Sequence, residues 1–149
     1  MNAEPLLEDI RVILYHKHHT SARTVFIRFA DGGVCAPEPL PPLAAVFPEE
    51  EFDAENSTLA VHPASLAMVL CRHLGLPADF LEIDPEFSAK VEVPGQVLSF
   101  YIGRFKFIDP PCAQFTERGG RFCAITELRG QPPAEMELLR RAYQAILGG

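Results

Sequence analysis

One segment with helical periodicity separates two groups of segments with strand periodicity, and this order restricts the fold more than any other feature of the chain. The helical segment covers residues 63–74, with a proline at its first position and Gly75 directly after it. Its apolar stripe consists of Leu66, Val69, Leu70, His73 and Leu74. The spacing predicts an amphipathic helix of about three turns, in which we expect His73 to be a hydrogen-bonded core residue.

Two segments rich in β-branched and aromatic residues precede this helix. They are residues 10–15 and residues 24–29, and a turn sequence, Asp31-Gly32-Gly33, follows the second. The pattern predicts a hairpin whose connection, residues 16–23, is polar and exposed. The histidines of that connection are His16, His18 and His19.

Residues 35–48 contain five prolines. Because proline fixes φ and supplies no backbone donor, we expect an irregular surface loop there. A run of acidic residues follows: Glu49, Glu50, Glu51, Asp53 and Glu55. Like charges at this density are typical of a solvated segment.

Strand patterns resume after the helix. Residues 87–93 alternate between apolar and polar, residues 97–102 are apolar on both faces, and residues 104–108 alternate again. Gly103, between the last two, is a candidate for a bulge. Residues 121–126 predict a final short strand.

A closing helix is predicted to begin at Pro132-Pro133. One face carries Met136, Leu139, Tyr143 and Ile146, and the other largely carries Glu135, Glu137, Arg140 and Arg141. The order of strands, helix, strands and helix predicts an α/β (α+β) fold in which a mixed β-sheet lies between helices. The length of 149 residues suits a single domain, residues 1–149.

Composition excludes several classes of protein. The formal charge of −7 disfavours a nucleic-acid partner, and no apolar run reaches the roughly 20 residues of a membrane helix. The acidic N-terminal segment is unlike a signal peptide, so we expect a cytoplasmic protein with no membrane partner. The cysteines Cys35, Cys71, Cys112 and Cys123 include no close pair, so we expect reduced thiols and no zinc site.

Several segments together resemble a Nudix hydrolase domain. They are the helix ending in Leu74-Gly75-Leu76, the Glu86-Phe87 strand, the segment from Leu98 to Phe105, and Ile125-Thr126-Glu127-Leu128 before a helix. The resemblance implies a mixed sheet sandwiched between helices and a ligand that carries a diphosphate.

The signature of that family, G-x5-E-x7-R-E-U-x-E-E-x-G-U with U apolar, is degenerate in this chain. When its last two positions are placed on Gly75 and Leu76, Leu70 also matches, and no other defined position does. The remaining positions fall on Ala54, Ala60, Met68, Val69, Arg72 and His73. In the family the glutamates bind divalent metal, which neutralises the diphosphate and activates water. Their replacement disfavours Mg²⁺ here, so we expect no cofactor.

We therefore expect a catalytically degenerate Nudix-like protein that serves as a binding or regulatory module for a small phosphorylated or nucleotide-like molecule. Arginine contacts phosphate directly, so basic side chains are the natural ligand contacts. The candidate ligand-binding residues are Lys17, Arg28, Arg72, His73 and Arg104.

Two alternatives remain open. In the first, Glu49, Glu50 and Glu51 rebuild a magnesium site, and the protein is an active pyrophosphohydrolase of nucleoside diphosphate derivatives. Consecutive side chains point in different directions, which favours a solvated loop over such a site. In the second, the chain is a protein-interaction module that forms a homodimer through an exposed aromatic surface running from Phe100 to Phe107.

Overall fold

The computed structural model describes residues 7–21, 23–48, 62–107 and 111–148. The elements, in chain order, are β1 (Ile10–Lys17), β2 (Thr24–Arg28), β3 (Cys35–Ala36), β4 (Ala45–Val46), α1 (Pro63–Leu74), β5 (Leu81–Ile83), β6 (Ala89–Val93), β7 (Gln96–Phe105), α2 (Cys112–Thr116), β8 (Arg121–Cys123), the 3₁₀ helix η4 (Ile125–Leu128) and α3 (Pro133–Gly148).

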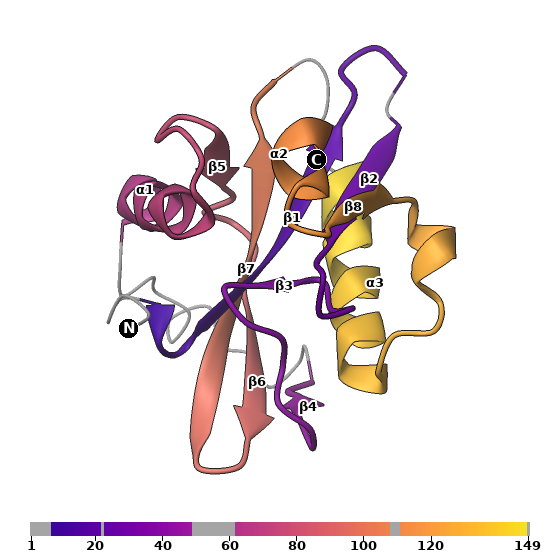
Figure 1. Ribbon diagram of the computed structural model, residues 1–149. Helices are drawn as coiled ribbons and strands as arrows, with labels where there is room; N and C mark the ends of the chain where they lie inside the picture. The colour runs from indigo at the N-terminus through magenta and orange to yellow at the C-terminus, as the bar shows by residue number, and fades with distance from the viewer. Residues whose placement is uncertain (1–6, 22, 49–61, 108–110, 149) are drawn as a thin grey trace.

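The strands form one mixed sheet of eight strands. Its order is β4-β6-β7-β1-β2-β8, with β3 added to β1 and β5 added to β7. The two long strands β1 and β7 run parallel through its centre (Figure 1), with Val12 opposite Tyr101 and Tyr15 opposite Arg104. All other pairings, including the predicted hairpin of β1 with β2, are antiparallel.

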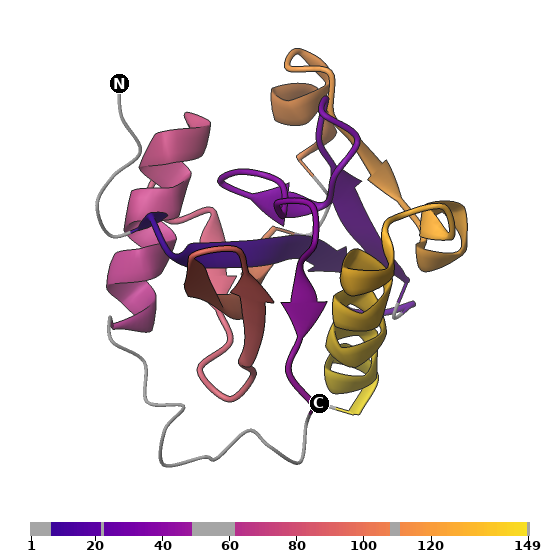
Figure 2. The same ribbon diagram turned by 90° about the horizontal axis from the view of Figure 1, so that it is seen from below.

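Helices cover both faces of this sheet, as the sequence predicts. The apolar residues of α1, with Phe115 of α2, form one buried cluster with alternate residues of β1, β5 and β7. The apolar stripe of α3 forms the second cluster with the opposite set of strand residues. Figure 2 shows α1 and α3 on opposite sides of the sheet. Among the described helices, none has both the length and the apolar composition to cross a membrane.

Helix α1 begins and ends where the sequence predicts, because both ends are capped. The imidazole Nδ1 of His62 accepts a hydrogen bond from the amide of Ala64 at 3.1 Å. Gly75 adopts φ 74°, which lets the amide of Leu76 reach the carbonyl oxygen of Cys71 at 2.8 Å. His73, expected in the core, is instead exposed at the margin of the apolar stripe.

The hairpin connection is shorter than predicted, because β1 continues through Lys17. His16 is therefore a strand residue and is buried, not exposed. Its Nε2 lies 2.7 Å from the carbonyl oxygen of Phe107, so the ring joins β1 to the end of β7. His18 and His19 are stacked on each other in the turn.

Strand β7 is continuous through Gly103, where the sequence suggested a bulge between two strands. Gly103 is in register with Leu14 on one side and Ile83 on the other. A Cβ at this position would lie 3.0 Å from Leu14 Cδ2 and 3.2 Å from Ile83 Cδ1. The glycine is required by close packing above the strand, not by a change of register.

The aromatic surface proposed for dimerisation is not present on this strand. Phe100 and Phe105 are fully buried, one in each core cluster, and Tyr101 is buried in the same cluster as Phe105. Phe107, which follows the strand, is 42% exposed. The aromatic content of β7 therefore builds the core instead of an interaction surface.

Two further predictions are wrong because residues expected at the surface are buried. Residues 35–48 are not wholly irregular, because they contribute the short strands β3 and β4, and Cys35 and Ala36 are buried. Glu135 and Arg141, placed on the solvated face of the last helix, are buried at 3% and 9% exposure. The 35–48 segment packs beside α3: the Arg141 guanidinium donates a 2.9 Å hydrogen bond to the carbonyl oxygen of Phe47.

Candidate functional site

The site is built on α3, whose stripe of buried residues fixes its orientation on the sheet. Leu138, Leu139 and Ala142 are completely buried against the strands. Met136 and Tyr143 lie on the flank of this stripe and are only partly buried. They form one wall of the site because they project sideways from the helix instead of into the sheet.

The opposite wall is η4, which follows β8 directly. Leu128 anchors it in the core and is completely buried. The Glu127 carboxylate accepts a 2.7 Å hydrogen bond from the amide of Ala124, which fixes the first turn. Ile125 is then held at the surface of the core, facing α3.

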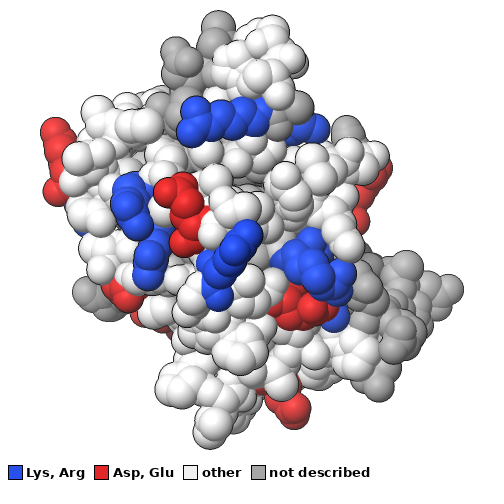
Figure 3. Space-filling view, turned by 90° about the vertical axis from the view of Figure 1, so that its right-hand side faces the viewer, with Lys and Arg blue, Asp and Glu red and all other residues white. Residues whose placement is uncertain are grey.

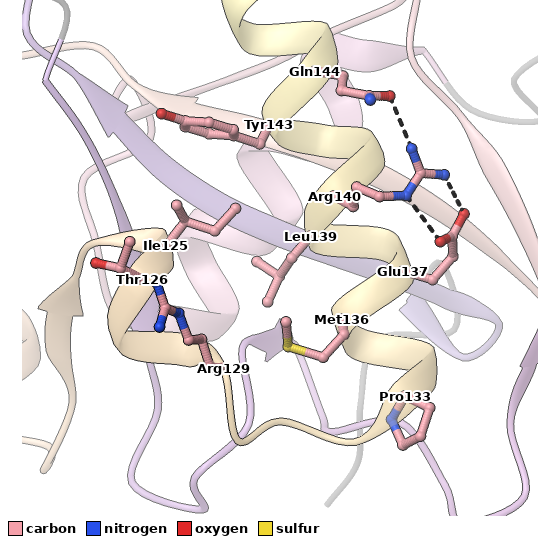
Figure 4. A pocket seen from close by; sticks show the side chains of 10 residues that line it. All are labelled: Ile125, Thr126, Arg129, Pro133, Met136, Glu137, Leu139, Arg140, Tyr143 and Gln144. Carbon is pink, nitrogen blue, oxygen red and sulfur yellow. Dashed lines mark hydrogen bonds and ion pairs between the residues drawn. The ribbon is translucent and has the colours of Figure 1, made fainter.

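Between η4 and α3 lies a groove of about 680 Å³, which we call the η4–α3 groove. Figure 4 shows Met136, Leu139 and Tyr143 projecting from α3 toward η4, where Ile125 lies. Its lining residues are Ile125, Thr126, Arg129, Pro133, Met136, Glu137, Leu139, Arg140, Tyr143 and Gln144. A mainly apolar hollow of this size with a few polar groups at its margin is characteristic of small-molecule sites.

The polar groups of the groove differ between its two walls. On the η4 side, the side chain of Arg129 lies beside Thr126 (Figure 4). On the α3 side, the guanidinium of Arg140 is directed toward Glu137 and Gln144. Among the lining residues, Arg129 is therefore the cation that a ligand in the groove would meet on the η4 side.

Glu137 organises the charges of the α3 wall. Its carboxylate accepts hydrogen bonds from Arg140 at 2.6 and 3.0 Å and from Arg141 at 2.7 Å. These bonds, those of Arg140 above all, lower the pKa of Glu137 to about 2. The carboxylate is ionised at neutral pH, and it balances charge on two arginines of the helix.

The surface on the side that bears α3 carries side chains of both charges. The protein carries a formal charge of −7. On the side that bears α3, however, basic side chains are spread over the surface with acidic ones between them (Figure 3).

The structure does not bring the five predicted ligand-binding residues together. Arg72 and His73 are on α1, on the other side of the sheet from α3. Lys17 donates its Nζ proton to the carbonyl oxygen of Ile146 at 3.0 Å, and Arg104 faces Glu82 across β5 and β7. Arg28 lines a polar cavity beside the first turn of α3.

The predicted metal alternative cannot be placed, because Glu49, Glu50 and Glu51 lie outside the described residues. Within the described residues, no three side chains of histidine, cysteine, aspartate or glutamate are grouped closely enough to hold a metal ion. Cys71 and Cys123 are buried and Cys112 is exposed, as the sequence indicates. Burial raises the pKa of the Cys35 thiol well above its ordinary value, so that thiol is protonated.

The sequence analysis did not identify Arg129, Met136 and Tyr143 as candidate ligand contacts. The sequence does place Met136 and Tyr143 on one face with Leu139, and it places Arg129 directly before Gly130. The missing information is the position of η4, which depends on the pairing of β8 with β2. A local pattern contains no signal for that contact.

Comparison with models of known families finds no match for this sequence, and comparison with curated proteins finds none either.

Proposed function

We propose that this protein is a binding or regulatory module for a small phosphorylated, nucleotide-like molecule, which it holds in the η4–α3 groove. The observation that carries the proposal is the combination of an apolar floor with a cation at the groove margin. Met136 and Tyr143, which are both partly buried, supply the floor, and Arg129 supplies the cation. The resemblance to the Nudix family supports the same ligand class.

The apolar part of the ligand is expected to lie against α3. The ring of Tyr143 is partly buried and packs on Phe26, with ring centroids 6.4 Å apart. A supported aromatic ring of this kind offers a flat surface to a planar group such as a nucleobase. Met136 adds a polarizable side chain that adapts to irregular shapes.

The anionic part of the ligand is expected to lie at Arg129. A guanidinium binds phosphate through paired hydrogen bonds, and Thr126, which lines the same groove, carries a hydroxyl that can add another. The guanidinium of Arg140 makes two hydrogen bonds to the Glu137 carboxylate. We therefore expect Arg140 to act on the ligand through its charge and not through a direct contact.

Thermal unfolding of the purified protein with ADP, AMP, adenosine and inorganic phosphate tests this proposal. ADP and AMP should raise the melting temperature, by an amount that corresponds to about 2.7 kcal/mol at a hundredfold excess over the dissociation constant. Adenosine or phosphate alone should give a smaller rise, because each occupies half of the groove.

A pair of charge-matched variants locates the site. Arg129→Gln should weaken ADP binding at least tenfold, whereas Arg23→Gln, in the exposed hairpin turn, should bind like the natural protein. Absence of stabilisation by any of the four probes contradicts the proposal. Release of phosphate from ADP during incubation, with or without Mg²⁺, contradicts the non-catalytic assignment.

A further inference from the structure

A second cavity, of about 360 Å³, lies beside the first turn of α3 and is separate from the η4–α3 groove. We call it the polar cavity. Its polar lining comes from Arg28 of β2, Asp31 of the turn after it, Gln131 just before α3, and Glu135 in the first turn of α3. An adjoining hollow of about 280 Å³ is lined by Leu40 and by prolines of two segments, Pro41-Pro42 and Pro132-Pro133.

Gln131 presents an acceptor atom with a fixed orientation to this cavity. The side chain is 8% exposed, and both of its amide protons are used: Nε2 donates to the carbonyl oxygen of Gly32 at 2.9 Å and to Glu135 Oε1 at 2.7 Å. Its Oε1 has no hydrogen-bond partner within the described part of the chain. Every inaccessible side-chain oxygen in that part of the chain has a hydrogen-bond partner. Since Gln131 Oε1 has none, it must be accessible, and it is open to the cavity.

Two carboxylates, those of Asp31 and Glu135, line the same cavity. Glu135 is 3% exposed and accepts the bond from Gln131. Asp31 accepts a 2.7 Å bond from the amide of Gly33 through Oδ1, which leaves Oδ2 available. Gln131 Oε1 and Asp31 Oδ2 are therefore two acceptors suited to an ammonium group, which carries three donors and no acceptor.

Arg28 provides the opposite charge. Its Nε donates to the carbonyl oxygen of Gly32 at 3.0 Å, and its terminal nitrogens form no hydrogen bond or ion pair with the described residues. A guanidinium binds a carboxylate through paired hydrogen bonds. This end of the cavity is therefore suited to a carboxylate.

We propose that the polar cavity binds a zwitterionic amino acid. Arg28 contacts the α-carboxylate, and Gln131 Oε1 and Asp31 contact the α-ammonium. An apolar side chain extends past Leu40 into the adjoining hollow. The site is independent of the η4–α3 groove and of the ligand proposed for it.

Isothermal titration with L-leucine tests the inference, with leucinamide and N-acetylleucine as probes that lack the carboxylate and the ammonium respectively. L-leucine should bind saturably, and each capped probe should bind at least tenfold more weakly. Absence of saturable L-leucine binding, or equal binding of all three probes, overturns the proposal.

Two variants assign the two ends of the ligand. Arg28→Gln should weaken L-leucine binding at least tenfold and leave the affinity for leucinamide unchanged. Asp31→Asn keeps the acceptor for Gly33 but removes the charge, so it should weaken leucinamide binding and leave N-acetylleucine unaffected. If either variant binds all three probes like the natural protein, the assignment of that end is wrong.

The same titrations separate this inference from the function proposed for the groove. Arg129→Gln should bind L-leucine normally. Binding of L-leucine without any nucleotide binding would contradict the proposed function alone, whereas nucleotide binding without L-leucine binding would contradict this inference alone. Unchanged melting temperatures of the variants, measured in the same buffer, exclude unfolding as the cause of a loss.

Discussion

The Nζ of Lys17 donates a 3.0 Å hydrogen bond to the carbonyl oxygen of Ile146, although 129 residues separate the two positions. Lys17 is the last residue of β1, and Ile146 lies in the last turn of α3. The last carbonyls of a helix have no partner within it, and the helix dipole makes that end negative. A cation on the central strand thus fixes the end of the helix that bears the candidate site.

Replacing Lys17 with methionine should lower the free energy of unfolding by about 1 kcal/mol, because the hydrogen bond and the favourable dipole interaction are lost together. Methionine keeps most of the aliphatic side chain, so packing is conserved. Urea unfolding measures the change. Lys106→Met, which removes an exposed lysine just beyond β7, is the matched control. Equal stabilities of the two variants would show that the bond contributes nothing.

Elements whose signals are local agree well with the sequence prediction. Helix α1 has its proline, apolar stripe and C-terminal glycine within 13 consecutive residues, from Pro63 to Gly75, so all the information that defines it is close in sequence. The strands of the first hairpin are equally evident, because β-branched and aromatic residues dominate both. The mixed sheet between helices follows from the order of these elements.

Short elements were not predictable in the same way. Strand β5 has three residues and α2 has five, too few for a period to be recognised. Strand β5 exists because it pairs with β7, and α2 is held by Phe115, whose ring packs against Phe29, Phe105 and Phe122. Tertiary contacts, not local preference, determine both elements.

The candidate sites were less predictable than the fold for the same reason. The resemblance directs attention to α1, and Arg72 and His73 are there, but the cavities adjoin α3. Arg28 is the predicted residue that lines one of them. Glu135 is charged and precedes the apolar stripe, so the sequence pattern predicts a surface residue. In the folded protein it is 3% exposed, because the turns at 31–34 and 130–132 cover it.

Gly103→Ala should destabilise the protein by about 1–3 kcal/mol, because its methyl group would contact Leu14 and Ile83 at about the limit of van der Waals approach. Gly130→Ala provides the comparison. No heavy atom lies within 4 Å of the position of its Cβ, so that variant should be neutral within about 0.5 kcal/mol. Chemical denaturation of both variants measures the difference, and similar values would exclude close packing as the reason for the strand glycine.

Glu137→Gln should remove part of the stability in a way that depends on pH. Hydrogen bonds from Arg140 and Arg141 lower the pKa of Glu137 to about 2, so its contribution is complete above pH 4.5 and is lost as the pH falls toward 2. The side chain is 35% exposed, so the natural protein should exceed the variant by only about 0.2–1 kcal/mol at pH 7. Denaturation curves of both proteins from pH 2 to 7 should converge at the acidic end. Glu86→Gln, at an exposed position, is the matched control.

Glu135→Gln should show the opposite dependence on pH. Burial raises the pKa of Glu135, and the nearby Asp31 adds to the effect, while the hydrogen bonds from Gln131 and Val34 and the charge of Arg28 oppose it. The folded protein therefore holds this proton at pH values where the unfolded chain has released it. Stability falls as the pH rises from 4.5 through the raised pKa, because the native state must then hold an ionised carboxylate in a buried position.

Glutamine cannot ionise, so the variant lacks this loss. The free energy of unfolding of the natural protein minus that of Glu135→Gln should be larger at pH 4 than at pH 8. This difference should fall smoothly between the two pH values. The comparison uses the change with pH, not the absolute stability, since the amide also alters the hydrogen bonds with Gln131 and Val34. Urea unfolding across this range measures it. Parallel stability curves for the two proteins would mean that Glu135 titrates as an ordinary surface carboxylate, despite its 3% exposure.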